Sequence, residues 1–274
     1  MTPATYNFME QIDLEIGPLR PLRGFFAAAE RVAIDHGIRL AIEHDFDALL
    51  TFNKTQSESW YPLTPMYDPR VNSMTPDTSF WISGRDPQGD IVATQCARYY
   101  DWTGTDFKAE FESLRLAYEY PDAAMYPEEL AICEAPSGPR ITGPVCFSGA
   151  AWYRPDYRGT GLSSFLPRIS RALAYTRWGT DYTYSFIEPK LAAKGVAARY
   201  GYTHIEPGVE WLNSFRGSCR FCLLWMHRDQ MLADLCNWLD LQTNAEEALL
   251  LNPGIRRNRS VLQELSGKIQ HNTA

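Results

Sequence analysis

The sequence predicts an α/β fold, and three observations lead to it. Residues 145–178 have the pattern of a buried strand, a glycine turn and an amphipathic helix. Residues 180–187 follow as a second strand, which a helical crossover would place parallel to the first. Residues 79–83 and 91–99 have the pattern of a hairpin, because 85–90 between them is rich in turn-forming residues.

The central unit divides into a strand over 145–153, a turn over 155–163 and a helix that begins at Leu162. The apolar positions of this helix repeat at helical spacing: Leu162, Phe165, Leu166, Ile169, Ala172, Leu173 and Thr176. Arg168 and Arg171 fall on the opposite face. We therefore expect one face of the helix to pack on the sheet.

The other elements are expected on both sides of this unit. Asp45 is the expected N-cap of a short second helix. In chain order we expect a helix over 21–36, a strand over 37–43, helices over 46–52 and 107–118 (the latter capped by Thr105), a helix over 191–200, strands over 202–205 and 221–227, and a helix over 229–241. A weaker helical tail with a basic patch at Arg256, Arg257 and Arg259 follows.

Composition limits the possible functions. The chain has 274 residues, of which 45% are hydrophobic and 22% charged, as in an ordinary globular protein. Its formal net charge of -7 does not favour nucleic acid as a partner. The sequence shows no signal peptide and no apolar run of membrane-spanning length, so we expect a cytoplasmic protein without a membrane partner.

No metal site is expected. Of six cysteines, Cys219 and Cys222 alone lie close together, and a structural zinc site needs a second such pair. The five histidines are scattered without metal-ligand spacing. The cysteine pair is therefore interpreted as the start of a strand.

The glycine turn has the pattern of a phosphate cradle. Gly159 and Gly161 allow a close approach of the backbone, and the first N–H groups of the following helix can point at an anion. Arg158 adds a forked positive donor that suits phosphate oxygens. The turn matches neither the nucleoside triphosphatase loop nor the dinucleotide fingerprint.

The run Arg158-Gly159-Thr160-Gly161-Leu162-Ser163 resembles the pyrophosphate loop of the GNAT superfamily of acyl-CoA-dependent N-acyltransferases, usually written [RQ]-x-x-G-x-[GA]. Arg158 and Gly161 match, whereas Ser163 stands where Gly or Ala is usual. The lead-in Arg154-Pro155-Asp156-Tyr157 is also similar to that family. The resemblance implies a mixed, mostly antiparallel sheet with a central splayed parallel pair and flanking helices.

The resemblance also implies a domain organisation and a ligand. A GNAT-like domain would span 37–230 with an insertion at 101–140, between an N-terminal extension (1–36) and a C-terminal helical extension (231–274). Acetyl-CoA would be the co-substrate and a small-molecule amine the acceptor, in a monomer or homodimer. The residues implied to bind the cofactor are Trp152, Tyr153, Arg154, Arg158, Gly159, Thr160, Gly161, Leu162 and Ser163.

The catalytic groups are less defined. The tyrosine that protonates the departing thiolate in the family is replaced here by Ala197, and Tyr200 is interpreted as a packing residue. Glu134 and Tyr184 are the candidates for acid–base chemistry at the amine, with a plain surface carboxylate as the alternative for Glu134. The thiolate could also leave without a proton donor, because an ordinary thiol has a pKa of about 8.5.

Two segments bear on the acceptor. The aromatic, proline-rich loop 60–72 either forms a pocket wall or packs flat on the core, and the insertion 101–140 either selects the acceptor or is decorative. The function expected is transfer of an acetyl or other acyl group from coenzyme A to an amine. A non-catalytic acyl-CoA-binding protein of the same fold and an unrelated phosphate-binding α/β protein remain as alternatives.

Overall fold

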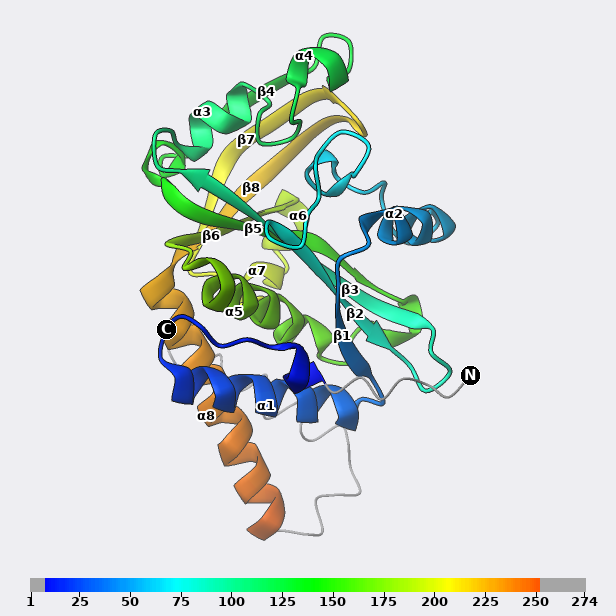
Figure 1. Ribbon diagram of the computed structural model, residues 1–274, viewed down its shortest axis with the longest axis vertical. Coiled ribbons are helices and arrows are strands. Elements are labelled where there is room, and N and C mark those ends of the chain that lie inside the picture. The colour runs from blue at the N-terminus through cyan, green and yellow to red at the C-terminus, as the bar shows by residue number, and fades with distance from the viewer. Residues whose placement is uncertain (1–7, 252–274) are drawn as a thin grey trace.

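A computed structural model describes residues 8–251 of the chain, and in it one sheet of eight strands forms the centre of the molecule (Figure 1). The strands lie side by side in the order β1-β2-β3-β5-β6-β8-β7-β4. Their bounds are β1 (Arg39–Glu43), β2 (Ser79–Arg85), β3 (Ile91–Trp102), β4 (Leu130–Cys133), β5 (Gly143–Tyr153), β6 (Tyr182–Ile187), β7 (His204–Ser214) and β8 (Gly217–His227).

The pairing confirms the predicted fold class. Six of the seven neighbouring pairs in this sheet are antiparallel, and β5 with β6 forms the one parallel pair, at its centre. The helix that joins these two strands is α5, as a crossover connection requires. The sheet is therefore mixed and mostly antiparallel, with the parallel pair where the sequence places it.

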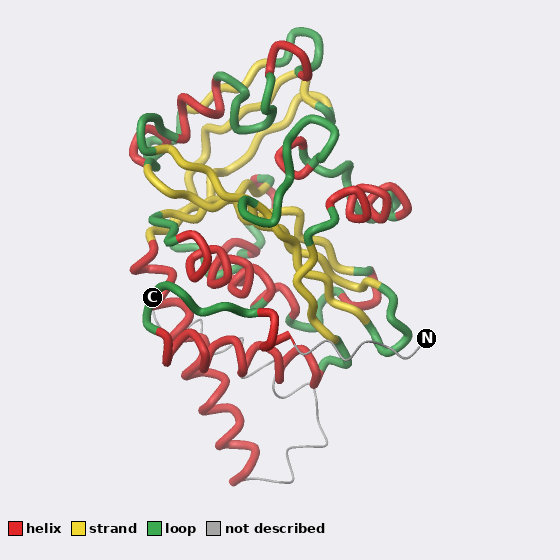
Figure 2. Tube along the Cα trace, viewed as in Figure 1, coloured by secondary structure: helices red, strands yellow, loops and turns green. Residues whose placement is uncertain are grey.

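Helices cover both faces of this sheet. Their bounds are α1 (Leu19–Asp35), α2 (Phe46–Thr55), α3 (Phe107–Glu112), α4 (Pro121–Ala124), α5 (Leu166–Trp178), α6 (Pro189–Ala192), α7 (Val196–Arg199) and α8 (Arg228–Leu251). α1, α5 and α8 contact one another on one face, below the strands in Figure 2. We call this side the α5 face and the opposite side, which carries α2 and α3, the α2 face. None of the helices in the part of the chain described here has the length and apolarity to cross a membrane.

Each face has its own core. On the α5 face, aliphatic and aromatic side chains such as Phe26, Ile82 and Leu224 are fully buried. On the α2 face, rings dominate, with Tyr67, Phe111 and Trp211 among the largest buried side chains. The sheet thus separates two packed layers, and a ligand between β5 and β6 would meet both.

Local sequence signals fix several helix ends. Asp45 caps α2 as expected, because its side chain accepts a hydrogen bond of 2.8 Å from the amide of Ala48. Gly37, at φ +71°, ends α1, and its amide donates to the carbonyl of Ile34. These contacts involve neighbours in the chain, so the sequence was sufficient to predict them.

Two predicted helices differ from the structure. The cap of α3 is Asp106 rather than Thr105, and the helix ends at Glu112 shortly before Leu114, whose φ is +61°. The helix expected over 191–200 is two short helices, α6 and α7, because Gly195 between them has φ +70°. The short strand β4 inside the insertion was not predicted. The basic patch at 256–259 lies outside the described residues.

The polar face predicted for α5 is buried. Arg168 is 7% exposed and Arg171 is 0% exposed, because α8 covers that side of the helix. Asp234 of α8 forms ion pairs with both guanidinium groups, at 2.8 Å and 3.2 Å. α5 is therefore enclosed by the sheet on one side and by the C-terminal helix on the other.

Candidate functional site

β5 and β6 pair at three positions and then part. The paired residues are Val145 with Tyr182, Cys146 with Thr183 and Phe147 with Tyr184. β5 continues to Tyr153 along β3, whereas β6 continues along β8. We call the point of separation the fork, and the side of β5 beyond it that turns away from β3 the open edge. An unpaired strand edge presents backbone N–H and C=O groups to a ligand.

A β-bulge lies at the fork. The register between β3 and β5 shifts between Thr94 and Cys96, and Ala150 has φ +49°. Side chains of β3 replace the missing ladder bonds. Gln95 donates its amide N–H to the carbonyl of Gly149 at 3.2 Å, and the Thr94 hydroxyl donates to that of Ala150 at 3.0 Å. Two carbonyl groups of the bulge are therefore fixed by hydrogen bonds from side chains of β3.

The glycine turn follows the open edge directly. Gly159 and Gly161 both have positive φ, +77° and +95°, which other residues adopt at a cost. Within residues 8–251, no backbone hydrogen bond is donated by the amides of Thr160, Gly161 or Ser163. A short 3-10 turn over Leu162–Ser164 then leads into α5. Amides without a partner of this kind are the donors that a phosphate cradle uses, and the cradle remains a prediction.

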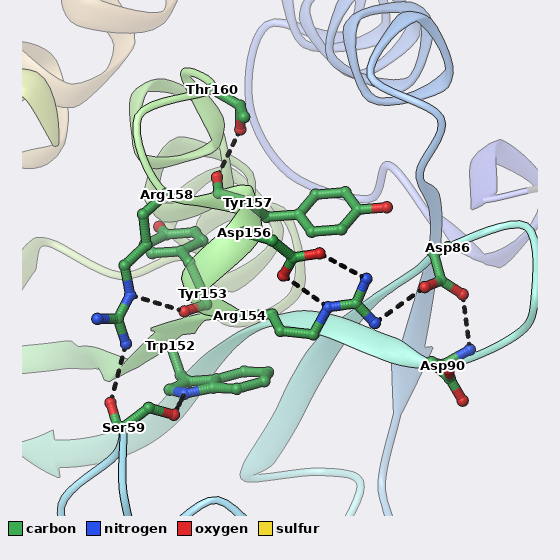
Figure 3. A network of polar contacts seen from close by, with 10 residues as sticks. All are labelled: Ser59, Asp86, Asp90, Trp152, Tyr153, Arg154, Asp156, Tyr157, Arg158 and Thr160. Atoms are coloured by element: carbon green, nitrogen blue, oxygen red, sulfur yellow. Dashed lines mark hydrogen bonds and ion pairs between the residues drawn. The ribbon is translucent and has the colours of Figure 1, made fainter.

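Arg158 lies against the open edge (Figure 3). Its Nε donates to the carbonyl of Tyr153 and its Nη2 to the carbonyl of Ser59, both at 3.0 Å. The amide of Arg154 donates to the carbonyl of Val92 on β3. Backbone groups of successive strand residues point to opposite sides, so the N–H and C=O of Tyr153 face the open edge. Arg158 therefore occupies the end of that edge, beside the turn in which the sequence places it.

Arg154 holds the start of the turn. Its guanidinium forms ion pairs with Asp156 at 2.8 Å and with Asp86 of the β2–β3 hairpin at 3.0 Å (Figure 3). Hydrogen bonds to these carboxylates, Asp156 first, raise its pKa. Two carboxylates compensate its charge, so Arg154 anchors the turn to the hairpin.

The two aromatic residues at the end of β5 point to opposite faces. On the α2 face, Trp152 stacks on Trp60 with ring centroids 5.5 Å apart and donates its indole N–H to the Ser59 hydroxyl. On the α5 face, Tyr153 packs against the core, and its buried hydroxyl has no hydrogen-bond partner among residues 8–251. Burial raises the pKa of Tyr153 well above the usual value. Trp60 thus forms a wall beside the open edge.

Residues 56–62, which we call the strap, reach across the fork. One end is held by the contacts of Ser59 with β5 and the turn. Beyond it, Tyr61 lies under the guanidinium of Arg216, 3.6 Å from the ring centre, and Arg216 bonds Glu188 at 2.8 Å. Glu188 directly follows β6, so the strap connects the ends of the two separated strands. These contacts join four segments that are distant in the chain, so no local sequence pattern predicts them.

The two candidates for acid–base chemistry do not lie together. Tyr184 is the last paired residue of β6, is 0% exposed, and packs its ring 5.1 Å from that of Phe147. Burial raises its pKa well above the usual value. Glu134 is exposed and directly follows β4, at the edge of the sheet, where its amide donates to Gly208. Tyr184 adjoins the fork, and Glu134 is separated from β6 by the two strands β8 and β7.

An open cavity of about 850 Å³ lies on the α2 face, between the start of α2, the loop 69–74 and residues 119–124 of the insertion. Its wall includes the carboxylates of Asp45, Asp47 and Glu119. Phe46 in this wall stacks on Tyr67 at 6.3 Å, and Tyr67 stacks on Phe147 at 5.2 Å, so two ring contacts connect the cavity to the fork. Across residues 8–251, no group of three acidic, histidine or cysteine side chains is placed to hold a metal ion.

Comparison with known proteins gives a distant likeness. No family model and no curated protein matches the chain. It is similar to the solved structure of the aminoglycoside acetyltransferase AAC(6')-Ib in complex with coenzyme A and kanamycin, at 14% identity and a TM-score of 0.39, over 70% of this chain and 95% of that one. It is similar to Arabidopsis thaliana NAA60 in complex with acetyl-CoA, at 11% identity and a TM-score of 0.42, over 70% and 99%.

A putative phosphinothricin N-acetyltransferase is a third similar structure, at 16% identity and a TM-score of 0.38, over 69% of this chain and 98% of that one. Two of these three structures are described as acetyltransferases, and the third contains acetyl-CoA. Likeness at this level of identity and TM-score carries no argument about the reaction.

Proposed function

We propose that the chain is an acyl-CoA-dependent N-acyltransferase, which transfers an acetyl or other acyl group from coenzyme A to an amine. The observation that carries the proposal is the fork, whose open edge leads directly into a glycine turn in which the amides of Thr160, Gly161 and Ser163 donate no backbone hydrogen bond within residues 8–251. A strand edge suits the amide-containing pantetheine arm, and a turn at a helix start suits a pyrophosphate. The strand edge and the turn are consecutive in the chain, so the pantetheine arm and the pyrophosphate of one ligand could bind side by side.

The turn would hold the pyrophosphate. The amides of Thr160, Gly161 and Ser163 provide donors without a side-chain charge, and Arg158 provides the adjacent positive charge. In the structure Arg158 is bonded to two carbonyl groups, of which that of Tyr153 faces the open edge. Binding would therefore require Arg158 to exchange at least one of these contacts for a phosphate oxygen.

The open edge would hold the pantetheine arm and the thioester. Carbonyl groups at the bulge are fixed by Thr94 and Gln95 of β3, so the backbone around Gly149 and Ala150 keeps its shape although β6 has separated from it. Preorganised N–H groups stabilise the negative charge that develops on a thioester oxygen when an amine attacks it. The bulge is the proposed place for this step.

The amine would approach from the α2 face. Both the strap and the insertion border that side, and the cavity there presents three carboxylates that suit a positively charged amine. Arg70, also in its wall, is paired with Asp68 and adds little compensating charge. The amine must lose a proton before attack. Tyr184 adjoins the fork but is closed off in an aromatic cluster, so it would act only after the strap or its neighbours move.

A non-catalytic acyl-CoA-binding protein is the second candidate. Two observations favour it. Tyr184 is enclosed by aromatic side chains, and Ala197, which is 0% exposed, has no group that could donate a proton to the thiolate. Both candidates predict ligand binding, and turnover alone separates them.

Calorimetric titration with acetyl-CoA, 3′,5′-ADP and acetyl-pantetheine tests the shared part of the proposal. We expect micromolar binding of acetyl-CoA and weaker binding of each fragment. Absence of binding at millimolar acetyl-CoA would contradict both candidates. Release of free thiol in the presence of a panel of amines then tests catalysis, and binding without any release would leave the non-catalytic candidate.

A further inference from the structure

In the part of the chain that the structure describes, the ion pairs between α5 and α8 leave one positive charge uncompensated. Arg168 uses its whole guanidinium. Two nitrogens contact Asp234 at 2.8 Å, and Nη1 donates to the carbonyls of Ser164 and Arg199. Arg171 reaches the same carboxylate with Nη2 at 3.2 Å. Two guanidinium groups, on side chains that are 8% and 0% exposed, therefore share the carboxylate of a side chain that is 17% exposed.

Arg171 is also short of hydrogen-bond partners. It is 0% exposed, and its Nε and Nη1 have no partner among residues 8–251. Its guanidinium lies 4.7 Å from the ring centre of Tyr202, whose buried hydroxyl has Arg171 and Ser148 beside it but no hydrogen bond of good geometry among residues 8–251. An arginine buried to this degree normally has its donors satisfied, because each unsatisfied donor destabilises the folded state.

The neighbouring groups do not neutralise Arg171. On β5, Cys146 and Ser148 lie on this side, and Ser148 is bonded to Ser170 of α5 at 3.0 Å. Burial raises the pKa of the Cys146 thiol, and burial raises that of Tyr202 to about 12, so both stay neutral at pH 7. An arginine does not lose its proton in a protein. Within the described residues, Asp234 is therefore the one carboxylate that forms an ion pair here.

A water molecule could satisfy the unpaired donors but would leave the charge. An uncompensated charge in a medium of low dielectric constant is strongly unfavourable, whereas a paired one is tolerated. The unpaired atoms are buried, so a small anion is favoured over a phosphate or an organic carboxylate. A single small anion satisfies both requirements.

We propose that a monovalent anion of the size of chloride binds between α5, α8 and the segment after α7. The Nε–H and Nη1–H groups of Arg171 and the hydroxyl of Tyr202 would donate to it. The site is independent of the proposed acyl transfer and would join the C-terminal helix to the centre of the fold. It also explains why the polar side of α5 can be buried.

Thermal unfolding in different sodium salts at constant ionic strength tests the proposal. Chloride and bromide should raise the Tm by about 3 °C for each tenfold increase in concentration above the dissociation constant, because they bind only the folded protein. Gluconate, which is too large to enter, should have no such effect. Equal Tm values in halide and gluconate would overturn the proposal.

Variants separate this site from general salt effects. Arg171→Met should abolish the difference between chloride and gluconate, whereas Arg177→Met, at an exposed position on the same helix, should retain it. Tyr202→Phe keeps the ring under the guanidinium and should reduce the halide effect severalfold, so it serves as the test if Arg171→Met fails to fold. A halide effect that survives both Arg171→Met and Tyr202→Phe would contradict the assignment.

A crystal soaked in bromide gives the direct result. We expect an anomalous difference peak within hydrogen-bond distance of Arg171, with no peak in a crystal of the Arg171→Met variant. Density for water alone at that position, without an anomalous signal, would overturn the proposal.

Discussion

The two faces of the sheet bury ionised groups in different ways. On the α2 face, Glu129 is 5% exposed and accepts hydrogen bonds from the Tyr118 hydroxyl, the Trp211 indole and the Tyr126 amide. On the α5 face, Arg171 is 0% exposed and has one bond to a carboxylate that it shares. The extent of burial alone therefore does not show whether a charged side chain stabilises the fold. A fully bonded group stabilises the packing around it, and a poorly bonded one indicates a missing partner.

The largest expected effect comes from removing the fully bonded group. Glu129→Ala leaves three donors without an acceptor, two of them buried, so we expect a loss of about 3–5 kcal/mol in the free energy of unfolding. Urea denaturation measures it, with Asp122→Asn, at an exposed position in α4, as the control. A loss below about 1 kcal/mol would show that the hydrogen bonds of Glu129 do not stabilise the α2 face.

The packing around the ion pairs on the α5 face gives the next effect. A Cβ at Gly201 would lie 2.4 Å from Oδ2 of Asp234 and 2.6 Å from Nη2 of Arg168, at φ +82°. Gly195 shares the positive φ but has nothing within 4 Å of a Cβ. Gly195→Ala should cost about 1 kcal/mol, and Gly201→Ala about 2–3 kcal/mol. If both variants lose the same free energy of unfolding in chemical denaturation, the ion-paired side chains move aside for the new methyl group at no cost.

The open edge lies between the two faces and is tested through Arg158. Arg158→Glu should weaken acetyl-CoA binding more than tenfold, because it reverses the charge beside the turn and releases two carbonyl groups. Arg220→Glu makes the same change in net charge at an exposed position on β8 and should leave affinity unchanged. Calorimetry compares the two variants, and equal affinities would place the cradle elsewhere.

The smallest effect is expected for the poorly bonded group. In halide-free buffer, Arg171→Met should change the free energy of unfolding by no more than about 1 kcal/mol, because Asp234 keeps both contacts with Arg168. The result sharpens the comparison with Glu129→Ala in the same denaturation assay. If Arg171→Met loses as much free energy of unfolding as Glu129→Ala, the guanidinium of Arg171 has hydrogen-bond partners in solution even without halide.

Local patterns predicted much of the fold. The hairpin turn at 85–90, the glycine turn and the caps at Asp45 and Gly37 depend on neighbouring residues, and the structure confirms them. The parallel pairing of β5 with β6 was also predicted, because a short helical crossover allows little else. The residues of the turn were predicted as a site, and their role remains a proposal.

Contacts between distant segments could not be predicted. α5 was given a polar face because Arg168 and Arg171 align on it, yet Asp234, more than sixty residues later, makes that face an interior. The strand β4 has four residues and forms only because β7 offers an edge far along the chain. Periodicity reveals which residues share a side of a helix, and the covering element decides whether that side meets solvent.

The central claim is that the open edge of β5 and the glycine turn bind acyl-CoA together. Amide hydrogen exchange with and without saturating acetyl-CoA tests it directly, because bound amides exchange more slowly. We predict protection in peptides that cover 148–163, with little change in peptides from α1 or from the β7–β8 hairpin. Binding that leaves the exchange of 148–163 unchanged would contradict the account.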